Sequence, residues 1–289
     1  MIIGITGNSG TGKTSICNAL EKNKINGETP FVIDADKIVR KMSVKGEEYY
    51  NKIINIFGKE ILQENQELDR AKLARIVFVD KEKRELLNQI TYKYVVKEIE
   101  KQAKESKNNF VIIDAPLLIE SKLNEICDVV ISIIADKETK LKRIIKRDNL
   151  VEKTALDRLN AQKEDEFYIK NSNLVIINNN SDLEKQVEEI KKLINSELLK
   201  NQEIVIIQNE DLKIMQFRKL LEYTDLLHAF TLKPIDVKNS TEYEENKEQV
   251  DSNFKAICKL LKLDIKDIIR PYQAHTDNIK EVNEEMRNV

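Results

Sequence analysis

Residues 7–14 read Gly7-Asn8-Ser9-Gly10-Thr11-Gly12-Lys13-Thr14, and no other stretch constrains the fold as strongly. They match the pattern G-x-x-x-x-G-K-T of a phosphate-binding loop. A short apolar run, Met1–Ile5, precedes the loop, and a stretch of helical character, Lys13–Leu20, follows it. This strand–loop–helix context is what the motif requires. The alternative is a glycine-rich turn that binds no ligand. This alternative does not explain why a strand precedes the turn and a helix follows it.

The loop residues suit a triphosphate. Glycines let the backbone turn tightly and direct several N–H groups toward an anion, and the helix start adds its positive dipole end. Lys13 is expected to reach the β- and γ-phosphates, and the Thr14 hydroxyl to hold Mg²⁺. ATP and Mg²⁺ are therefore the expected cofactors. The predicted ATP-binding residues are Gly10, Thr11, Gly12, Lys13, Thr14 and Ser15.

Apolar runs alternate with helical patterns along the first 200 residues. The strand-like runs are Met1–Thr6, Phe31–Ile33, Phe110–Ile113, Val129–Ile134 and Leu174–Ile177. The helical patterns are Thr14–Asn23, Lys37–Phe57, Arg70–Ile76, Lys81–Ser106, Lys137–Arg147, Lys153–Tyr168 and Asp182–Leu199. Continuous apolar strands are typical of parallel sheets covered on both faces. The alternation predicts an α/β fold with a doubly wound parallel sheet and ligands at the carboxyl ends of its strands.

A boundary is expected near residue 200. The last helical pattern of the first part ends there, and a new apolar run, Ile204–Ile207, follows a short polar stretch. We predict a phosphate-binding domain at 1–200 and a small, incomplete α+β segment at 201–289. Within the second part, the sequence predicts an acidic loop at Asp236–Asp251 and a helix at Asn253–Leu261.

Composition excludes several classes of protein. The chain has 289 residues and a net charge of −2, without the basic excess expected of a nucleic-acid-binding protein. It has three cysteines in no C-x-x-C pattern, which favours reduced thiols in the cytoplasm over a disulfide framework. Its apolar runs are too short for a membrane span or a signal peptide. We expect a small-molecule substrate, no nucleic-acid or membrane partner, and a monomer or weak homo-oligomer.

Three aspartates follow predicted strands. Asp34 and Asp36 come after the second strand, and Asp114 after the third. Phosphoryl transfer needs a carboxylate that orients and deprotonates the acceptor hydroxyl, and Asp36 is the candidate. Asp114 could act through Mg²⁺ or its water. The alternatives are a helix N-cap for Asp36 and a turn-forming residue before Pro116 for Asp114.

Arginines on one predicted helix supply positive charge. Arg143 and Arg147 are four residues apart and share a helix face, and Arg158 follows. A planar guanidinium suits the phosphate oxygens that gain charge during transfer, so Arg143 and Arg147 are predicted to be catalytic. The alternative is a solvated basic face. The polar segment Arg147–Gln162, here called the lid, could close over the site and exclude water.

Several strings together resemble dephospho-coenzyme A kinases over residues 1–200. They are Ile5–Thr14, Ile33-Asp34-Ala35-Asp36-Lys37-Ile38-Val39-Arg40, Leu68–Phe78, Leu87–Ile90, Asp114-Ala115-Pro116-Leu117-Leu118-Ile119-Glu120, Arg143–Asp148, Gln162 and Asn178. The resemblance implies transfer of the ATP γ-phosphoryl group to the ribose 3′-hydroxyl of dephospho-coenzyme A, the last step of coenzyme A biosynthesis. It puts Asp36 at the proposed base position and Arg40 in the substrate region, and we predict that Asp34 and Asp114 also bind the substrate. It also implies a helical substrate-binding part, Tyr49–Ile99, and the lid.

The chain departs from the family pattern at several positions. Asn8 and Ser9 replace residues that are usually Gly and Ile, and Asn8 would suit a position that needs a positive φ. A common glycine before Leu68-Asp69-Arg70 is missing, and Tyr92-Lys93 stands where a His-Pro pair is usual. These changes affect the acceptor side more than ATP binding.

Residues 213–276 resemble the beginning of laccase-domain, purine nucleoside phosphorylase-like zinc proteins. The resemblance rests on Leu227-His228-Ala229-Phe230-Thr231, on Asn253, and on Gln273-Ala274-His275. In that family the Gln-x-His histidine is the first zinc ligand, and a cysteine and a second histidine follow it. Neither follows His275 here, and a catalytic zinc normally has three protein ligands. We therefore expect His275 not to bind zinc and this part to be a truncated fusion without its own activity.

Two other functions fit the loop. One is a nucleoside or nucleotide kinase, which would phosphorylate nucleosides rather than dephospho-coenzyme A. The other is a non-enzymatic nucleotide-dependent switch or adaptor, which would hydrolyse ATP slowly without an acceptor.

Overall fold

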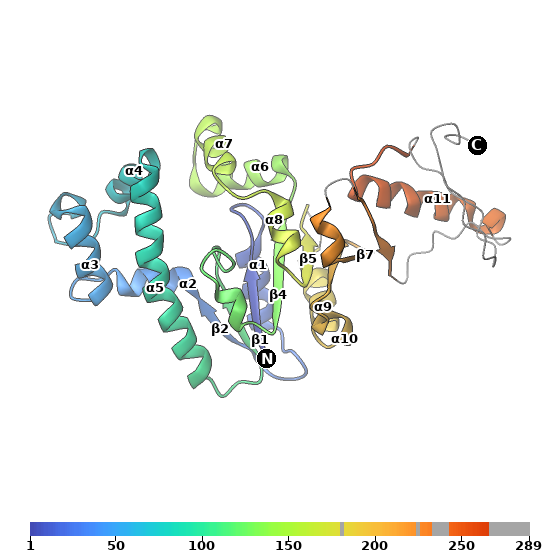
Figure 1. Ribbon diagram of the computed structural model, residues 1–289, viewed down its shortest axis with the longest axis horizontal. Coiled ribbons are helices and arrows are strands. Elements are labelled where there is room, and N and C mark those ends of the chain that lie inside the picture. The colour runs from blue at the N-terminus through green and yellow to red at the C-terminus, as the bar shows by residue number, and fades with distance from the viewer. Residues whose placement is uncertain (180–181, 224–225, 233–242, 266–289) are drawn as a thin grey trace.

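Within the residues that the computed structural model describes, 1–179, 182–223, 226–232 and 243–265, the strands form one sheet (Figure 1). They are β1 (Ile2–Thr6), β2 (Phe31–Asp34), β3 (Val111–Asp114), β4 (Val129–Ile134), β5 (Leu174–Ile177), β6 (Ile204–Asn209), β7 (Leu212–Phe217) and β8 (Phe230–Thr231). Their order is β2-β3-β1-β4-β5-β6-β7-β8. Neighbours from β2 to β6 are parallel, and β7 and β8 add an antiparallel edge. The predicted parallel α/β fold is confirmed.

The described α-helices largely follow the predicted patterns. They are α1 (Lys13–Lys22), α2 (Ala35–Met42), α3 (Glu48–Phe57), α4 (Arg70–Val79), α5 (Lys81–Glu105), α6 (Lys137–Asp148), α7 (Glu152–Asn160), α8 (Asp165–Lys170), α9 (Leu183–Ile194), α10 (Glu197–Lys200) and α11 (Tyr243–Leu260). No helix in these residues has the length and apolar character of a membrane span.

Four predicted segments have other boundaries in the structure, and one of them is the pattern Asp182–Leu199, which is divided into α9 and α10. The pattern Lys37–Phe57 forms two helices, α2 and α3, because the chain turns between them at Gly46, whose φ is +100°. The pattern Lys153–Tyr168 is also divided, into α7 and α8. Residues 243–251, predicted as loop, belong to α11, and residues 233–242 lie outside the described part.

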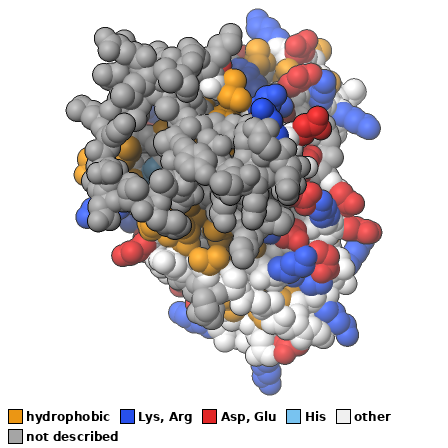
Figure 2. Space-filling model, turned by 90° about the vertical axis from the view of Figure 1, so that its right-hand side faces the viewer, with side chains coloured by type: hydrophobic (Ala, Val, Ile, Leu, Met, Phe, Trp, Pro, Cys, Tyr) orange, Lys and Arg blue, Asp and Glu red, His pale blue; other side chains and the backbone are white. Residues whose placement is uncertain are grey.

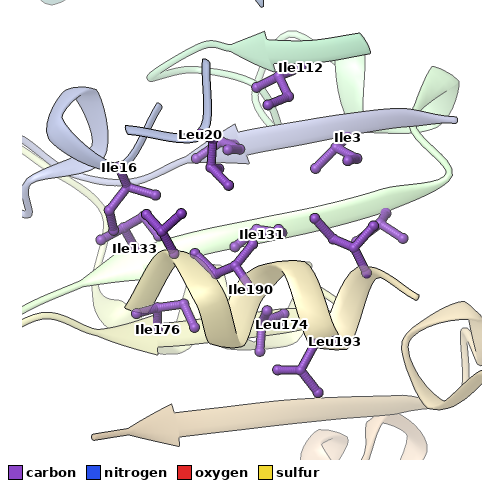
Figure 3. Close-up of a cluster of buried hydrophobic side chains, with 14 of the residues drawn as sticks. Ile3, Ile16, Leu20, Ile112, Ile131, Ile133, Leu174, Ile176, Ile190 and Leu193 are labelled. Atoms are coloured by element: carbon purple, nitrogen blue, oxygen red, sulfur yellow. The ribbon is translucent and has the colours of Figure 1, made fainter. Parts of the chain in front are cut away.

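The two faces of the sheet have separate hydrophobic cores. On one face, α1 and α9 pack Ile16, Leu20 and Ile190 against strand residues such as Ile3 and Ile131 (Figure 3). On the other face, α2 and α5 cover alternate residues of β2, β3 and β4. Each fully buried isoleucine or leucine contributes about 1.5–3 kcal/mol, so the strand ends are held on a rigid base.

Helices α3, α4 and α5 have a core of their own. Tyr49, Ile53, Phe57 and Ile61 are buried there with Ile90 of α5. Helices α3 and α4 lie to one side of the sheet, α5 runs from them along the sheet, and α6 and α7 lie near the carboxyl end of β4 (Figure 1). The predicted helical part is therefore a distinct layer, joined to the sheet through α2 and α5.

The sheet continues through residue 200. β6 pairs in parallel with β5, and Val205, Ile207 and Ile214 share a buried cluster with Val175 and Tyr168. The end of the molecule that carries α11 has hydrophobic side chains among charged ones (Figure 2). Strands from both sides of residue 200 share one sheet. The proposed division at residue 200 into two folding units stays a prediction.

Arg218 joins the two sides of that division. Its guanidinium donates to the carbonyl oxygens of Gln202 (2.9 Å), Ser172 (2.8 Å) and Ile204 (3.2 Å), and also to that of Lys170. Desolvation in this half-buried position lowers the pKa of Arg218. The side chain therefore ties the strand β6 region to the segment between α8 and β5.

We expect Arg218→Ala to lower the free energy of unfolding by about 3 kcal/mol or more, because several charged hydrogen bonds are lost together. Urea unfolding followed by circular dichroism measures this change. Lys219→Ala is the matched control at the next, exposed position, and it should stay within about 0.5 kcal/mol of the wild type. Equal stability of the two variants would contradict a clamping role for Arg218.

Candidate active site

The carboxyl ends of neighbouring strands bring the loop and the predicted acids together. Asp34 ends β2 and Asp114 ends β3, and the register makes them direct neighbours. Asp114 is also level with Ile5 of β1, two residues before Gly7. The sheet thus aligns three segments that are far apart in the sequence at one edge, as expected for an α/β ligand site.

The loop backbone requires glycine. Gly7 has φ +148°, and a Cβ there would lie 2.3 Å from the carbonyl oxygen of Ile133. Gly12 has φ +89°, and a Cβ there would lie 2.4 Å from Nδ2 of Asn178. Gly12 is also the N-cap of α1 and offers no side-chain cap, so the first N–H groups of α1 are available to an anion. This backbone fits a phosphate group.

Lys13 and Asp114 form a buried ion pair. Their exposed fractions are 8% and 5%, and Nζ of Lys13 donates directly to Oδ1 of Asp114. Cys17 lies one turn further along α1, where burial, followed by the charge of Asp114, raises the pKa of its thiol. Lys13 is therefore held beneath the loop by a carboxylate, at the point from which it can turn toward a phosphate.

Asp34 and Asp36 have different local roles. Oδ1 of Asp34 accepts a hydrogen bond from the backbone N–H of Lys37 (2.9 Å), so Asp34 caps α2. Asp36 is exposed in the first turn, and the described part of the chain gives its carboxylate no hydrogen bond or ion pair. Arg40, four residues later, is exposed as well. The N-cap role considered for Asp36 thus belongs to Asp34, which leaves Asp36 open to a ligand.

The oxygen donors beside the loop suit magnesium. Thr14 and Ser15 are exposed in the first turn of α1, and Asp114 supplies a carboxylate. Mg²⁺ prefers oxygen ligands and usually takes few from the protein, with the rest from phosphates and water. In the described residues, no group of three or more His, Cys, Asp or Glu side chains could hold a metal by itself. The donors therefore fit a nucleotide-bound magnesium better than a resident one.

Arg143 stabilises the loop through hydrogen bonds to its backbone. Its Nη1 donates to the carbonyl oxygens of Gly10 (3.2 Å), Thr11 (3.3 Å) and Asn178 (3.0 Å). Asn178 adds a bond from Nδ2 to the carbonyl of Thr11 (2.8 Å). Burial lowers the pKa of Arg143, although its carbonyl partners keep the cation solvated by protein dipoles. Its contacts are thus with the backbone that forms the phosphate site.

Arg147 lies nearer the mouth of the loop. Its Nη2 donates to Oγ of Ser9 (3.0 Å), and its guanidinium forms two bonds to the carboxylate of Asp148. Asp148 also accepts from Arg158 of α7 (2.6 Å), and the bond from Arg147 is the main cause of its lowered pKa. The structure thus brings Arg147, which is predicted to be catalytic, and Arg158 together at one carboxylate.

Two polar residues near the loop were not predicted. The hydroxyl of Tyr168 donates to Oδ1 of Asn8 (2.7 Å). The sequence predicted only that Tyr168 is the last residue of a helix. Oε2 of Glu120 is buried without a hydrogen-bond partner in the structure, and burial raises the pKa of this carboxyl. Asn8 was considered only for its backbone, and its φ is not positive, so that explanation was wrong.

Comparison with known proteins gives a consistent result. A sequence profile of the family described as dephospho-CoA kinase matches residues 1–184. The dephospho-CoA kinase of Bacillus anthracis is 39% identical over 181 residues, which are 62% of this chain and 88% of that protein. The dephospho-CoA kinase of Listeria innocua is 40% identical over 196 residues, 66% of this chain and 94% of that protein.

A solved structure shares the fold. The crystal structure of TT1252 from Thermus thermophilus aligns with a TM-score of 0.55 and 26% sequence identity. The alignment covers 68% of this chain and 98% of that one.

Proposed function

The chain belongs to the dephospho-CoA kinase family, and from this premise we propose that it transfers the γ-phosphoryl group of ATP to the ribose 3′-hydroxyl of dephospho-coenzyme A. The observation that carries the proposal is the convergence of the glycine loop, the Lys13–Asp114 pair and the start of α2 at one sheet edge. In this assignment, the loop N–H groups and Lys13 bind the ATP phosphates.

Asp36 is the proposed base. The acceptor oxygen attacks the γ-phosphorus, its proton passes to the Asp36 carboxylate, and the bond to the β-phosphate oxygen breaks to release ADP. The exposed carboxylate beside the capped start of α2 supports this role, since within the described residues it has no hydrogen bond or ion pair and interacts with the Arg147 guanidinium through charge alone. Asp34 holds that helix start in position and, with Arg40, lies on the acceptor side.

Positive charge stabilises the transferred group. Mg²⁺, when bound with ATP, would neutralise phosphate charge, and Thr14 and Asp114 are the residues proposed to hold it. Arg147 is the arginine proposed to reach the phosphoryl oxygens, because its partners Ser9 and Asp148 leave it at the mouth of the loop. Arg143 is proposed to act on the loop backbone.

The proposal is tested by the choice of acceptor. ADP release should be measured with dephospho-coenzyme A, adenosine, deoxyadenosine and AMP as acceptors, and without an acceptor. We expect rapid ADP release with dephospho-coenzyme A alone. Preference for a nucleoside or a nucleotide would support the nucleoside or nucleotide kinase alternative, and slow hydrolysis unaffected by any acceptor would support the switch.

Arg143→Ala should raise the KM for ATP about tenfold or more and change kcat less, because the charged bonds that shape the loop are lost before any chemistry. Steady-state kinetics at varied ATP concentration measures both constants. Lys142→Ala is the matched control on the same helix, where an exposed pair with Glu138 should contribute little. A fall in kcat at unchanged KM would instead support the predicted catalytic role of Arg143.

The part after residue 200 is proposed to stabilise the enzyme and to have no activity of its own. The protein is proposed to act in the cytoplasm. Its resemblance to zinc proteins remains a proposal, and His275 lies outside the described residues. Nε2 of His228 accepts from the backbone N–H of Phe217 (2.7 Å), which supports a structural role for this histidine. We propose a monomer or weak homo-oligomer, which light scattering tests.

A further inference from the structure

Asn8 lies in the phosphate-binding loop, and both ends of its side-chain amide form hydrogen bonds. Nδ2 donates to the carbonyl oxygen of Lys163 (2.8 Å), and Oδ1 accepts from the hydroxyl of Tyr168 (2.7 Å). The carbonyl oxygen of Asn8 also accepts from Oγ1 of Thr11 (2.9 Å), so this residue belongs to the internal bonding of the loop. Asn8 therefore connects the loop to a segment about 155 residues away in the sequence.

The two partners of Asn8 come directly after the lid. Lys163 follows Gln162, the last lid residue, in the short connection between α7 and α8, and Tyr168 lies on α8. Because the chain leaves its helical path between α7 and α8, the Lys163 carbonyl can accept a bond from outside the helix. The connection that follows the lid is thus bonded to the phosphate-binding loop.

Tyr168 is well suited to hold a fixed position. Its side chain is buried, with 2% exposed, among Val175, Val205 and Ile207. Its ring meets that of Phe167 edge to face at 5.4 Å, and burial raises the pKa of its hydroxyl, which stays a donor. Lys140 of α6 pairs with Asp165 (3.2 Å) and anchors the same helix. The bond from Tyr168 therefore ties Asn8 to a rigid element.

We propose that Asn8 is a positioning residue that couples the geometry of the phosphate-binding loop to the base of the lid. The inference rests on the proposed kinase function and adds to it a link between the loop and the segment after the lid. Binding of phosphates in the loop then favours the ordered position of the lid, and the ordered lid favours phosphate binding. The two are coupled because the side-chain amide of Asn8 contacts both elements. Loss of this link should weaken ATP binding and let water compete with the acceptor.

The test is a double-mutant cycle of Asn8→Ala, Tyr168→Phe and the combined variant. We expect Asn8→Ala to raise the KM for ATP by roughly threefold to tenfold, and Tyr168→Phe by less. We also expect Asn8→Ala to increase the ratio of ATP hydrolysis to phosphoryl transfer. The combined variant should be no worse than Asn8→Ala, because the Tyr168 hydroxyl acts through Asn8.

Asn171→Ala is the matched control, since Nδ2 of this exposed residue bonds only within its own turn, to the Phe167 carbonyl (2.8 Å). It should leave the KM and the hydrolysis ratio unchanged. Additive effects of the two single variants, or a lower melting temperature with an unchanged KM and hydrolysis ratio, would overturn the proposal. If the wild type fails to phosphorylate dephospho-coenzyme A, the proposed function fails, while calorimetry with magnesium ATP still measures the contribution of Asn8 to nucleotide binding.

Discussion

Lys13→Ala is expected to lower kcat for phosphoryl transfer by about a thousandfold or more. The ammonium group is the only buried cation of the described loop–helix segment, residues 7–22, and it is aimed from beneath the loop. It would contact phosphate oxygens that gain charge in the transition state, and removal of one such preorganised donor typically costs about 10²–10³ in rate, with more for a charged one. Stopped assays with concentrated enzyme measure the residual rate.

A structural consequence of the same change must be separated from the chemical one. Without Lys13, Asp114 is left buried without its partner, which can cost about 3–5 kcal/mol of stability. Lys13→Ala combined with Asp114→Asn removes the uncompensated charge and should recover much of that stability without recovering turnover. Near-normal turnover in a folded Lys13→Ala enzyme would remove Lys13 from the mechanism.

Asp36→Asn should lower kcat by about 10²–10⁴ while the affinity for ATP changes little, because the amide can orient the acceptor hydroxyl but cannot accept its proton. Kinetics with varied dephospho-coenzyme A, together with calorimetric titration of ATP, separates these effects. A collapse of ATP affinity would instead make Asp36 a metal-binding or structural residue.

Glu82→Gln is the matched control for Asp36→Asn. Glu82 is exposed at the second position of α5, after the N-cap Asp80, as Asp36 is at the second position of α2, after the N-cap Asp34. Both changes remove the same helix-start charge, but α5 follows a turn from α4 and not a strand of the sheet. The control should keep nearly full activity, which assigns the loss in Asp36→Asn to its place at the strand end.

The sequence was sufficient for the parallel α/β core of residues 1–200 and for the end of the strands at which the site lies, although not for the continuation of the same sheet into β6, β7 and β8. Strand identity follows from uninterrupted apolar runs such as Val129–Ile134, all buried in the sheet. Parallel strands then align their carboxyl ends, so Asp34 and Asp114 could be expected beside the loop. Helix breaks were harder to predict, because the pattern Lys37–Phe57 continues through a turn that depends on Gly46.

Long-range polar contacts could not be read from the sequence. Arg143 is predicted to be catalytic from its charge and spacing, and that stays a prediction, but the bonds from its Nη1 to the carbonyls of Gly10 and Thr11, more than 130 residues away, could not be foreseen. Tyr168 was part of a helical pattern, and only the fold brings its hydroxyl to Asn8. Such contacts depend on side-chain direction in the packed structure, which periodicity does not report.

The most direct test is phosphorus NMR of a single reaction mixture that contains the enzyme, magnesium ATP and dephospho-coenzyme A. We predict that one phosphomonoester signal, coupled to the ribose 3′ proton, grows in equal amount with ADP. Release of inorganic phosphate without a new ester, or an ester at another position, would contradict the proposed reaction.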